Sequence, residues 1–350
     1  MNIDDWLYRL LKVGELSFDG AHNIHTPRDL VEEILSQIDL NGDILVLFNL
    51  EFVISLVYTY QVDPSRITFY SDHETKNSIC SRLGVKYITN LEVDMKFDVV
   101  IGNPPYQGDS NNSIWKDFLK KVIELDPNII CFITPRAILN GAKNDNQNLF
   151  LHLKSGLRFV KYVPARTFKV GKMIAAWVYD KNFNGTAKII IEDGSIIHDN
   201  VSQRPFLPYL VEDERSFKIA IKLLSFAESK SLQSCYDEFP ESLSGLVIPK
   251  NKHMSLKHRF VVDDKNDKSQ IKSKQFYFLP LIKTDHVMDY IDHPVFKFMW
   301  KILGISDGLG GTFFRKIPYL DLSRSWTEEE IYKHFGLIQE EIDYIEANVK

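Results

Sequence analysis

The sequence predicts an α/β protein in which a mostly parallel sheet is followed by a second, α+β domain. Between residues 25 and 180, short apolar runs alternate with amphipathic segments. The apolar runs are nearly continuous and rich in β-branched and aromatic residues, which is typical of strands buried on both faces of a sheet. Strands that alternate with helices in this way favour a parallel sheet covered by helices on both sides.

Five strands and four helices are expected in this region. The strands are expected at 44–48, 67–71, 86–88, 97–102 and 129–134, and the helices at 28–38, 52–60, 73–83 and 114–125. Two further strands, 157–163 and 173–179, are separated only by a turn at 167–172. Because this turn is too short for a crossover helix, we expect the two strands to form an antiparallel hairpin at the sheet edge.

The sequence texture changes after residue 180. Asp193-Gly194, between two apolar runs, predicts a further hairpin over 188–198. We therefore expect an N-terminal helical segment at 1–24, a first domain at 25–185, a second at 186–324 and a helical tail at 325–350. Thr327 with Glu330 forms the pattern of a capping box that begins the tail.

Composition excludes several classes of protein. The chain has 350 residues, 44% of them apolar, and no apolar run is long enough to cross a bilayer. The N-terminus does not have the pattern of a signal peptide, so a cytoplasmic protein without membrane association is expected. The three cysteines, Cys80, Cys131 and Cys235, have no metal-ligand spacing. We expect them to be core residues and expect no metal site.

Charge is unevenly distributed along the chain. The net charge of −5 means that bulk charge does not indicate nucleic-acid binding. A basic stretch nevertheless covers 250–274, and the C-terminal end is acidic. The candidates for contacts with phosphates are Lys250, Lys252, Lys257 and Arg259. On charge alone, a solvated loop explains this stretch equally well.

The most informative motif is Asn103-Pro104-Pro105-Tyr106, which directly follows the hydrophobic strand at 97–102. In an open α/β sheet, ligands bind beyond the carboxyl ends of the strands. The Asn103 side-chain oxygen and the Pro104 carbonyl can accept the two N–H bonds of an aromatic amine, whose lone pair is otherwise delocalised. The prolines hold these acceptors rigidly, and Tyr106 offers a flat face for a base. The alternative is an ordinary turn, but the position after a buried strand favours the functional interpretation.

With this motif the chain resembles the adenine-N6 DNA methyltransferases of the type II restriction–modification group. The resemblance implies a Rossmann-like S-adenosylmethionine-dependent methyltransferase sheet with a C-terminal target-recognition domain. It implies methyl transfer to N6 of a flipped-out adenine in double-stranded DNA, by an enzyme expected to be monomeric. A cognate restriction endonuclease is a candidate partner.

The resemblance also assigns roles to individual residues. Cofactor binding is implied for His25, Thr26, Pro27, Asp72, Asn90 and Asn103. Phe168 matches the aromatic residue that stacks on the flipped base opposite Tyr106. In one place the chain departs from the family, whose first strand is followed by an acidic residue, Pro and a Gly-x-Gly loop. Here Asn49 and Glu51 stand after the first strand, with no glycine before Gly84, and they are the candidates for the acidic contact.

Alternatives remain at several of these positions. Asp72 is equally typical of a helix cap. Thr26-Pro27 is also an ordinary helix start, and a core position is the alternative for Phe168, for which base stacking is favoured. The same motif also occurs in methyltransferases that act on RNA or on protein glutamine. A third possibility is a catalytically impaired protein that only binds DNA or a partner, since the glycine loop is missing.

Overall fold

The structure is a computed structural model that describes residues 25–92, 94–106, 114–140, 144–164, 166–168, 173–229, 245–249, 260–262, 276–280, 286–303 and 316–349. The chain divides into two compact units. The first comprises Met1–Ile138 with Leu151–Gln203, and the second Leu139–Phe150 with Arg204–Lys350. The expected helical segment at 1–24 lies outside the described residues.

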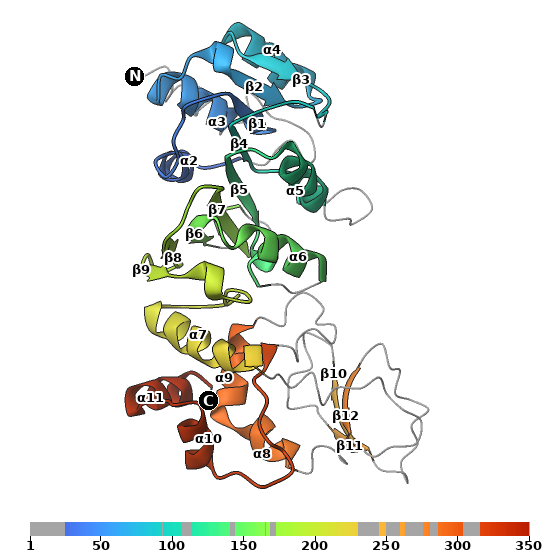
Figure 1. Ribbon diagram of the computed structural model, residues 1–350, viewed down its shortest axis with the longest axis vertical. Helices are drawn as coiled ribbons and strands as arrows, with labels where there is room; N and C mark the ends of the chain where they lie inside the picture. The colour runs from blue at the N-terminus through green and yellow to red at the C-terminus, as the bar shows by residue number, and fades with distance from the viewer. Residues whose placement is uncertain are drawn as a thin grey trace. The chain divides into compact units, whose positions relative to one another are not determined.

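The first unit is built on a nine-stranded sheet with the order β3-β2-β1-β4-β5-β7-β6-β8-β9 (Figure 1). Its parallel strands are β1 (Ile44–Leu47), β2 (Ile67–Tyr70), β3 (Lys86–Ile88), β4 (Val99–Gly102) and β5 (Ile129–Pro135). All five expected strands are present. The predicted Rossmann-like class is confirmed, because the order 3-2-1-4-5 is that of a doubly wound sheet.

The strand order reverses between β1 and β4, and this reversal determines where a ligand can bind. The two strands are parallel neighbours, and Leu47 at the end of β1 lies opposite Gly102 at the end of β4. A Cβ atom at Gly102 would approach the Leu47 Cβ to 2.8 Å, so glycine allows the strands to lie this close. A crevice outside the carboxyl ends of the strands at such a reversal is the usual ligand site of this fold.

Helices of the first unit follow the predicted amphipathic segments. They are α2 (Arg28–Leu35), α3 (Leu50–Ile54), α4 (Glu74–Arg82) and α5 (Ile114–Leu125). In α5 the buried residues are Trp115, Leu119, Val122 and Leu125, which are spaced as one helix face. The second helix begins at Leu50, closer to β1 than the expected 52, and continues as a π-helical turn at Ser55–Thr59. Every residue of α3 is buried, including Glu51.

The predicted hairpin of β6 (Leu157–Val163) and β7 (Ile174–Asp180) is present and antiparallel. Its predicted place at the sheet edge is wrong. The sheet continues through β8 (Ala187–Ile190), which pairs in parallel with β6, and β9 (Ile196–Asp199), joined to β8 by the predicted hairpin. Because this hairpin completes the large sheet, the first unit extends to Gln203 and does not end at the expected residue 185.

The second unit combines helices with a small antiparallel sheet, in agreement with the expected α+β class. Its sheet has the order β11-β10-β12, formed by Phe260–Val262, Gly245–Pro249 and Phe276–Pro280. Its helices are α7 (Glu214–Ser229), α8 (Val287–Asp292), α9 (Pro294–Ile302), α10 (Glu328–His334) and α11 (Gln339–Asn348). A further helix, α6 (Asn144–Leu153), spans the division between the two units.

The C-terminal helix α10 begins where the sequence predicts. Thr327 and Glu330 form the predicted capping box at the start of α10. The segment 325–350, expected as a helical tail, contains α10 and α11, and α11 is bonded to other parts of the second unit. Lys222 in α7 lies 2.6 Å from the Glu341 carboxylate, and the Tyr344 hydroxyl lies 3.0 Å from the Asp213 carboxylate.

Two general expectations can be compared with the structure. Cys80 and Cys131 are buried free thiols, as predicted for core residues, whereas Cys235 lies outside the described residues. Among the helices in the described ranges, none has the length and apolar character needed to span a membrane.

Candidate active site at the ends of β1 and β4

Asn103 lies directly after β4 and is held by three hydrogen bonds. Its backbone N–H donates to Asn49 Oδ1 at 3.2 Å, and its Nδ2 donates to Thr26 Oγ1 at 3.2 Å. Its Oδ1 accepts from the Tyr106 hydroxyl at 2.8 Å. With 1% of its surface exposed, the amide is oriented by the protein and not by water. The oxygen that the sequence assigns to a substrate amine is therefore occupied by Tyr106 in this structure.

Thr26 is the residue that joins the ends of the two strands. It is fully buried, and its hydroxyl also lies 3.5 Å from Asn49 Nδ2. The alternative role as an N-cap is excluded, because Pro27 occupies the N-cap position of α2 and makes no side-chain cap bond. Thr26 therefore orients the amides of Asn49 and Asn103.

Glu51 places a buried carboxylate beside this cluster. Its Oε1 accepts a hydrogen bond from the Thr26 backbone N–H at 3.2 Å and lies 2.6 Å from His25 Nδ1. The side chain is 5% exposed, whereas that of His25 is 32% exposed. Since Glu51 is in the first turn of α3, its negative charge is also favoured by the helix dipole.

Phe48 forms a strained turn directly after β1, at the place where this chain has no glycine. Its φ angle is 69°, and the Asn49 N–H donates to the Leu47 carbonyl at 2.9 Å across it. A bulky residue in this region of φ costs about 1–3 kcal/mol and persists only when its surroundings enforce it. Here the Phe48 ring packs edge-to-face on Phe118 and Tyr70, with centroid separations of 4.7 and 5.2 Å.

Lys76 stabilises the same turn from α4. Its Nζ donates to the Phe48 carbonyl at 2.7 Å, and the residue is 3% exposed. Burial lowers the pKa of Lys76 to about 8, an effect that the charges of Glu51 and Asp72 oppose. The strained backbone after β1 is thus held by a buried ammonium group.

Tyr106 is enclosed, together with both prolines of the motif. It is 5% exposed, and burial raises the pKa of its hydroxyl, against a smaller opposite effect of the bond to Asn103. Pro104 and Pro105 are buried as well. The hydroxyl therefore stays protonated over the ordinary pH range and donates to Asn103.

The remaining predicted residues differ in their placement. Asp72 is exposed after β2; it is not the N-cap of α4, because His73 holds that position. Asn90 is exposed after the edge strand β3, and Phe168 is half-buried in the turn that precedes β7. The predicted DNA contacts Lys250, Lys252, Lys257 and Arg259 lie outside the described residues.

Two buried cations of the first unit were not predicted from the sequence. Lys76 gave no signal, because it stands among polar residues of a short amphipathic helix. Arg136 did give a signal, because it directly follows the apolar strand β5. It is fully buried, and a buried arginine needs partners for its charge. Within the described ranges, no three His, Cys, Asp or Glu side chains gather as a metal site requires.

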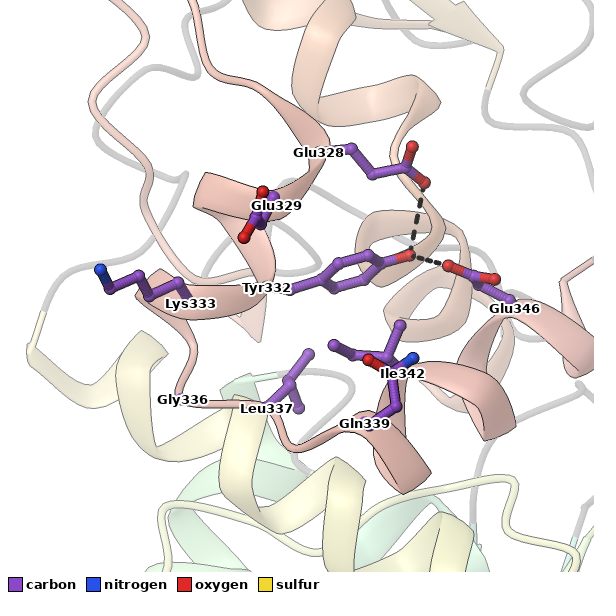
Figure 2. A pocket seen from close by; sticks show the side chains of 9 residues that line it. All are labelled: Glu328, Glu329, Tyr332, Lys333, Gly336, Leu337, Gln339, Ile342 and Glu346. Atoms are coloured by element: carbon purple, nitrogen blue, oxygen red, sulfur yellow. Dashed lines mark hydrogen bonds between the residues drawn. The ribbon is translucent and has the colours of Figure 1, made fainter.

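A concavity in the second unit has a different chemistry. It has a volume of about 720 Å³ and is lined by residues of α10 and α11 and their connection. Figure 2 shows the Tyr332 hydroxyl directed at the carboxylates of Glu346 and Glu328, at 2.9 and 3.5 Å. Because carboxylates repel phosphates, this concavity is not suited to the DNA backbone.

A match to a known protein family covers the Asn103–Tyr106 motif. Residues 68–168 match the family described as Eco57I restriction-modification methylase. A curated relative from Mycoplasma pneumoniae, described as an uncharacterized adenine-specific methylase, is 33% identical over 122 residues. That alignment covers 29% of this chain and 27% of the relative, so the chain matches about a quarter of the relative's length. The predicted resemblance to restriction–modification adenine methyltransferases is confirmed.

Solved structures of restriction–modification proteins are also similar, at low identity. The type IIG restriction endonuclease BpuSI aligns with 95% of this chain and 51% of its own, at 14% identity and a TM-score of 0.45. A type I restriction-modification methyltransferase subunit from Streptococcus thermophilus aligns with 51% of this chain and 49% of its own, at 15% identity and a TM-score of 0.38. This chain thus spans about half the length of each.

Proposed function

We propose that the protein transfers a methyl group from S-adenosylmethionine to N6 of an adenine in double-stranded DNA. One observation carries the proposal. Asn103 is buried at the carboxyl end of β4, where the strand order reverses, and Thr26 fixes the orientation of its amide. The family match over the same region supports a restriction–modification role.

The polar groups around β1 suit the parts of S-adenosylmethionine. The cofactor carries an ammonium group, a sulfonium and two ribose hydroxyls, which favour acidic acceptors. Glu51, with its buried carboxylate beside His25 and Thr26, suits the ammonium group, and Asp72 at the end of β2 suits the ribose. Asn49, directly after β1, and Pro27, the neighbour of Thr26, are proposed to complete this site. When bound there, the cofactor supplies an electrophilic methyl group.

The motif residues activate the adenine amine. Asn103 Oδ1 and the Pro104 carbonyl accept its two N–H bonds, which draws the nitrogen toward a tetrahedral form and makes its lone pair available. Before this, the Tyr106 hydroxyl leaves Asn103 Oδ1, which it occupies at 2.8 Å. The Tyr106 ring then stacks on the base opposite Phe168, and about 1–3 kcal/mol of stacking offsets the cost of extruding the base.

The second unit is proposed to recognise the target sequence. Its small antiparallel sheet lies near the basic stretch 250–274 in the sequence, as β11 begins at Phe260. Lys250, Lys252, Lys257 and Arg259 are proposed to contact phosphates and to make binding salt-dependent. We further propose that the protein acts in the cytoplasm as a monomer, with a cognate restriction endonuclease as a partner in the cell.

The test is transfer of a labelled methyl group to unmethylated DNA by the wild-type protein and by Asn103→Ala. We expect incorporation by the wild type and a loss of at least about 100-fold in the variant, because removing a preorganised acceptor typically costs this much. Equal incorporation by both proteins would refute the mechanism. Methylation of RNA or of protein glutamine without methylation of DNA would refute the substrate.

A further inference from the structure

Arg136 contacts three neighbouring strands, β5, β7 and β6, at the end of the sheet where β4 leads into Asn103. It is the first residue after β5, and its side chain has no exposed surface. Pro135 at the end of β5 lies opposite Ile174, the first residue of β7, and Ile174 lies opposite Val163, the last residue of β6. The connection from β6 to β7, which contains Phe168, therefore starts and ends beside Arg136.

Three contacts of Arg136 are made with the two ends of this connection. Its backbone N–H donates to the Met173 carbonyl at 2.8 Å. Its Nη2 lies 3.5 Å from the carbonyls of both Val163 and Ile174. A guanidinium is a rigid, planar group with several donors, so one side chain can bind both carbonyls and fix the distance between them.

The charge of Arg136 is balanced by the carboxylate of Glu192 and by the ring of Tyr162. Glu192, which follows β8, lies 2.5 Å from Nη2 and is 30% exposed. The guanidinium also lies over the ring of Tyr162, 4.2 Å from its centroid. Removing Glu192 would leave the fully buried guanidinium without this ionic partner, which is unfavourable.

We propose that Arg136 is a positioning residue that sets the height and angle at which the β6–β7 connection presents Phe168 to the flipped base. The role in base binding rests on the proposed function. The hydrogen bonds of Arg136 to the carbonyls of Val163, Met173 and Ile174 do not depend on it. Arg136 touches no substrate; it acts through the two ends of the connection.

The chain offers a matched control at the other end of the same strand pair. Arg158 near the start of β6 pairs with Asp180 at the end of β7, at 2.9 Å. Arg158→Met removes an ion pair between the same two strands without touching the ends of the Phe168 connection. A general loss of sheet stability therefore affects both variants, and loss of positioning affects only Arg136→Met.

The first arm of the experiment measures amide hydrogen exchange in full-length wild type, Arg136→Met and Arg158→Met. We expect exchange over 163–174 to accelerate at least about tenfold in Arg136→Met alone. Glu192→Gln, which keeps the arginine, should change the same segment in the same direction and serves as the test if Arg136→Met does not fold. Equal exchange in wild type and in these variants, or equal acceleration in Arg158→Met, would overturn the proposal.

The second arm measures methylation and base flipping on DNA. In Arg136→Met we expect kcat to fall about 10–100-fold, because small misplacements of binding groups have effects of this size, while the Kd for S-adenosylmethionine stays within twofold. The fluorescence of 2-aminopurine at the target position should show a less stacked base, and Arg136→Lys should restore part of both signals. Unchanged kcat and fluorescence would overturn the role in positioning. Absence of DNA methylation by the wild type would refute only the proposed function. The hydrogen-exchange experiment would still test whether Arg136 holds the two ends of the β6–β7 connection.

Discussion

The ends of β1 and β4 place polar groups at the same site by different physical means. The two strands have equal length, both are completely buried, and they pair residue by residue. After β4, Gly102 allows close approach to Leu47, and two prolines fix the backbone that carries Asn103. After β1, no glycine is present, and Phe48 takes a φ of 69° under the hold of Lys76.

The comparison shows how local and tertiary constraints can replace one another. The backbone at the β4 end is fixed mainly by its own two prolines, whereas the side chain of Asn103 is oriented by Thr26. The β1 end depends on a lysine from α4 and on ring contacts with Tyr70 and Phe118. We therefore expect substitutions after β4 to alter chemistry, and substitutions around β1 to alter cofactor binding and stability.

The largest effect is expected from Tyr106, at the β4 end. Tyr106→Ala removes the stacking surface, worth about 1–3 kcal/mol, and should lower kcat/KM for DNA about 10–100-fold. Tyr106→Phe keeps the ring and frees Asn103 Oδ1, which the hydroxyl occupies, so it should stay within about threefold of wild type. Steady-state kinetics on one DNA substrate measure both. A loss as large in Tyr106→Phe as in Tyr106→Ala would show that the hydroxyl, and not the ring, matters.

The second largest effect is expected from Lys76, which holds the Phe48 carbonyl at the β1 end. Lys76→Met removes a charge-assisted bond to the Phe48 carbonyl, worth about 1.5–3 kcal/mol of unfolding free energy. The Kd for S-adenosylmethionine should rise about tenfold, because the turn beside Glu51 loosens. Calorimetry and urea unfolding measure the two quantities. Lys86→Met, on the exposed strand β3, is the matched control and should change neither.

The charge of Lys76 also predicts a pH dependence of stability. Burial lowers its folded-state pKa to about 8, below the unfolded value, so between the two values the unfolded chain binds more protons. The unfolding free energy of the wild type should therefore rise with pH above 8, by up to about 3 kcal/mol near pH 10.5, relative to Lys76→Met. Lys316, whose pKa burial lowers to about 7, has an effect of the same sign but is present in both proteins. A difference that does not change with pH would contradict this account.

The smallest effect is expected from restoring the missing glycine. Phe48→Gly relieves about 1–3 kcal/mol of backbone strain but loses a buried ring worth about 3–5 kcal/mol, so stability should fall by about 2 kcal/mol. The Kd for S-adenosylmethionine should fall a few-fold, because a glycine lets the backbone approach the ligand. Thermal unfolding and calorimetry test this. Weaker binding would mean that the Phe48 ring itself supports the cofactor.

Much of the fold could be predicted because its signals are local. Alternation of apolar strands with amphipathic segments correctly indicated the five parallel strands, and Thr327 with Glu330 marked the start of α10. The position of the β6–β7 hairpin within the sheet could not be predicted. It depends on the pairing of β6 with β8, which is a long-range choice that periodicity does not encode.

The residues of the candidate site also divide into those with a local sequence signal and those whose contacts are long-range. Asn103 and its motif follow a buried strand, which is a local pattern. The roles of Thr26 and Lys76 are set by partners far away in the sequence, namely Asn103 and Phe48. The positive φ of Phe48 was not predictable, because an aromatic residue avoids this region unless tertiary contacts enforce it.

The most direct test of the proposed adenine site is single-molecule sequencing of DNA from cells that express either the wild-type protein or Asn103→Ala. If Asn103 and the Pro104 carbonyl grip an adenine amine, the wild-type cells will carry N6-methyladenine in one sequence context, and the Asn103→Ala cells will not. A modified cytosine, or the same N6-methyladenine pattern in both strains, would contradict the account.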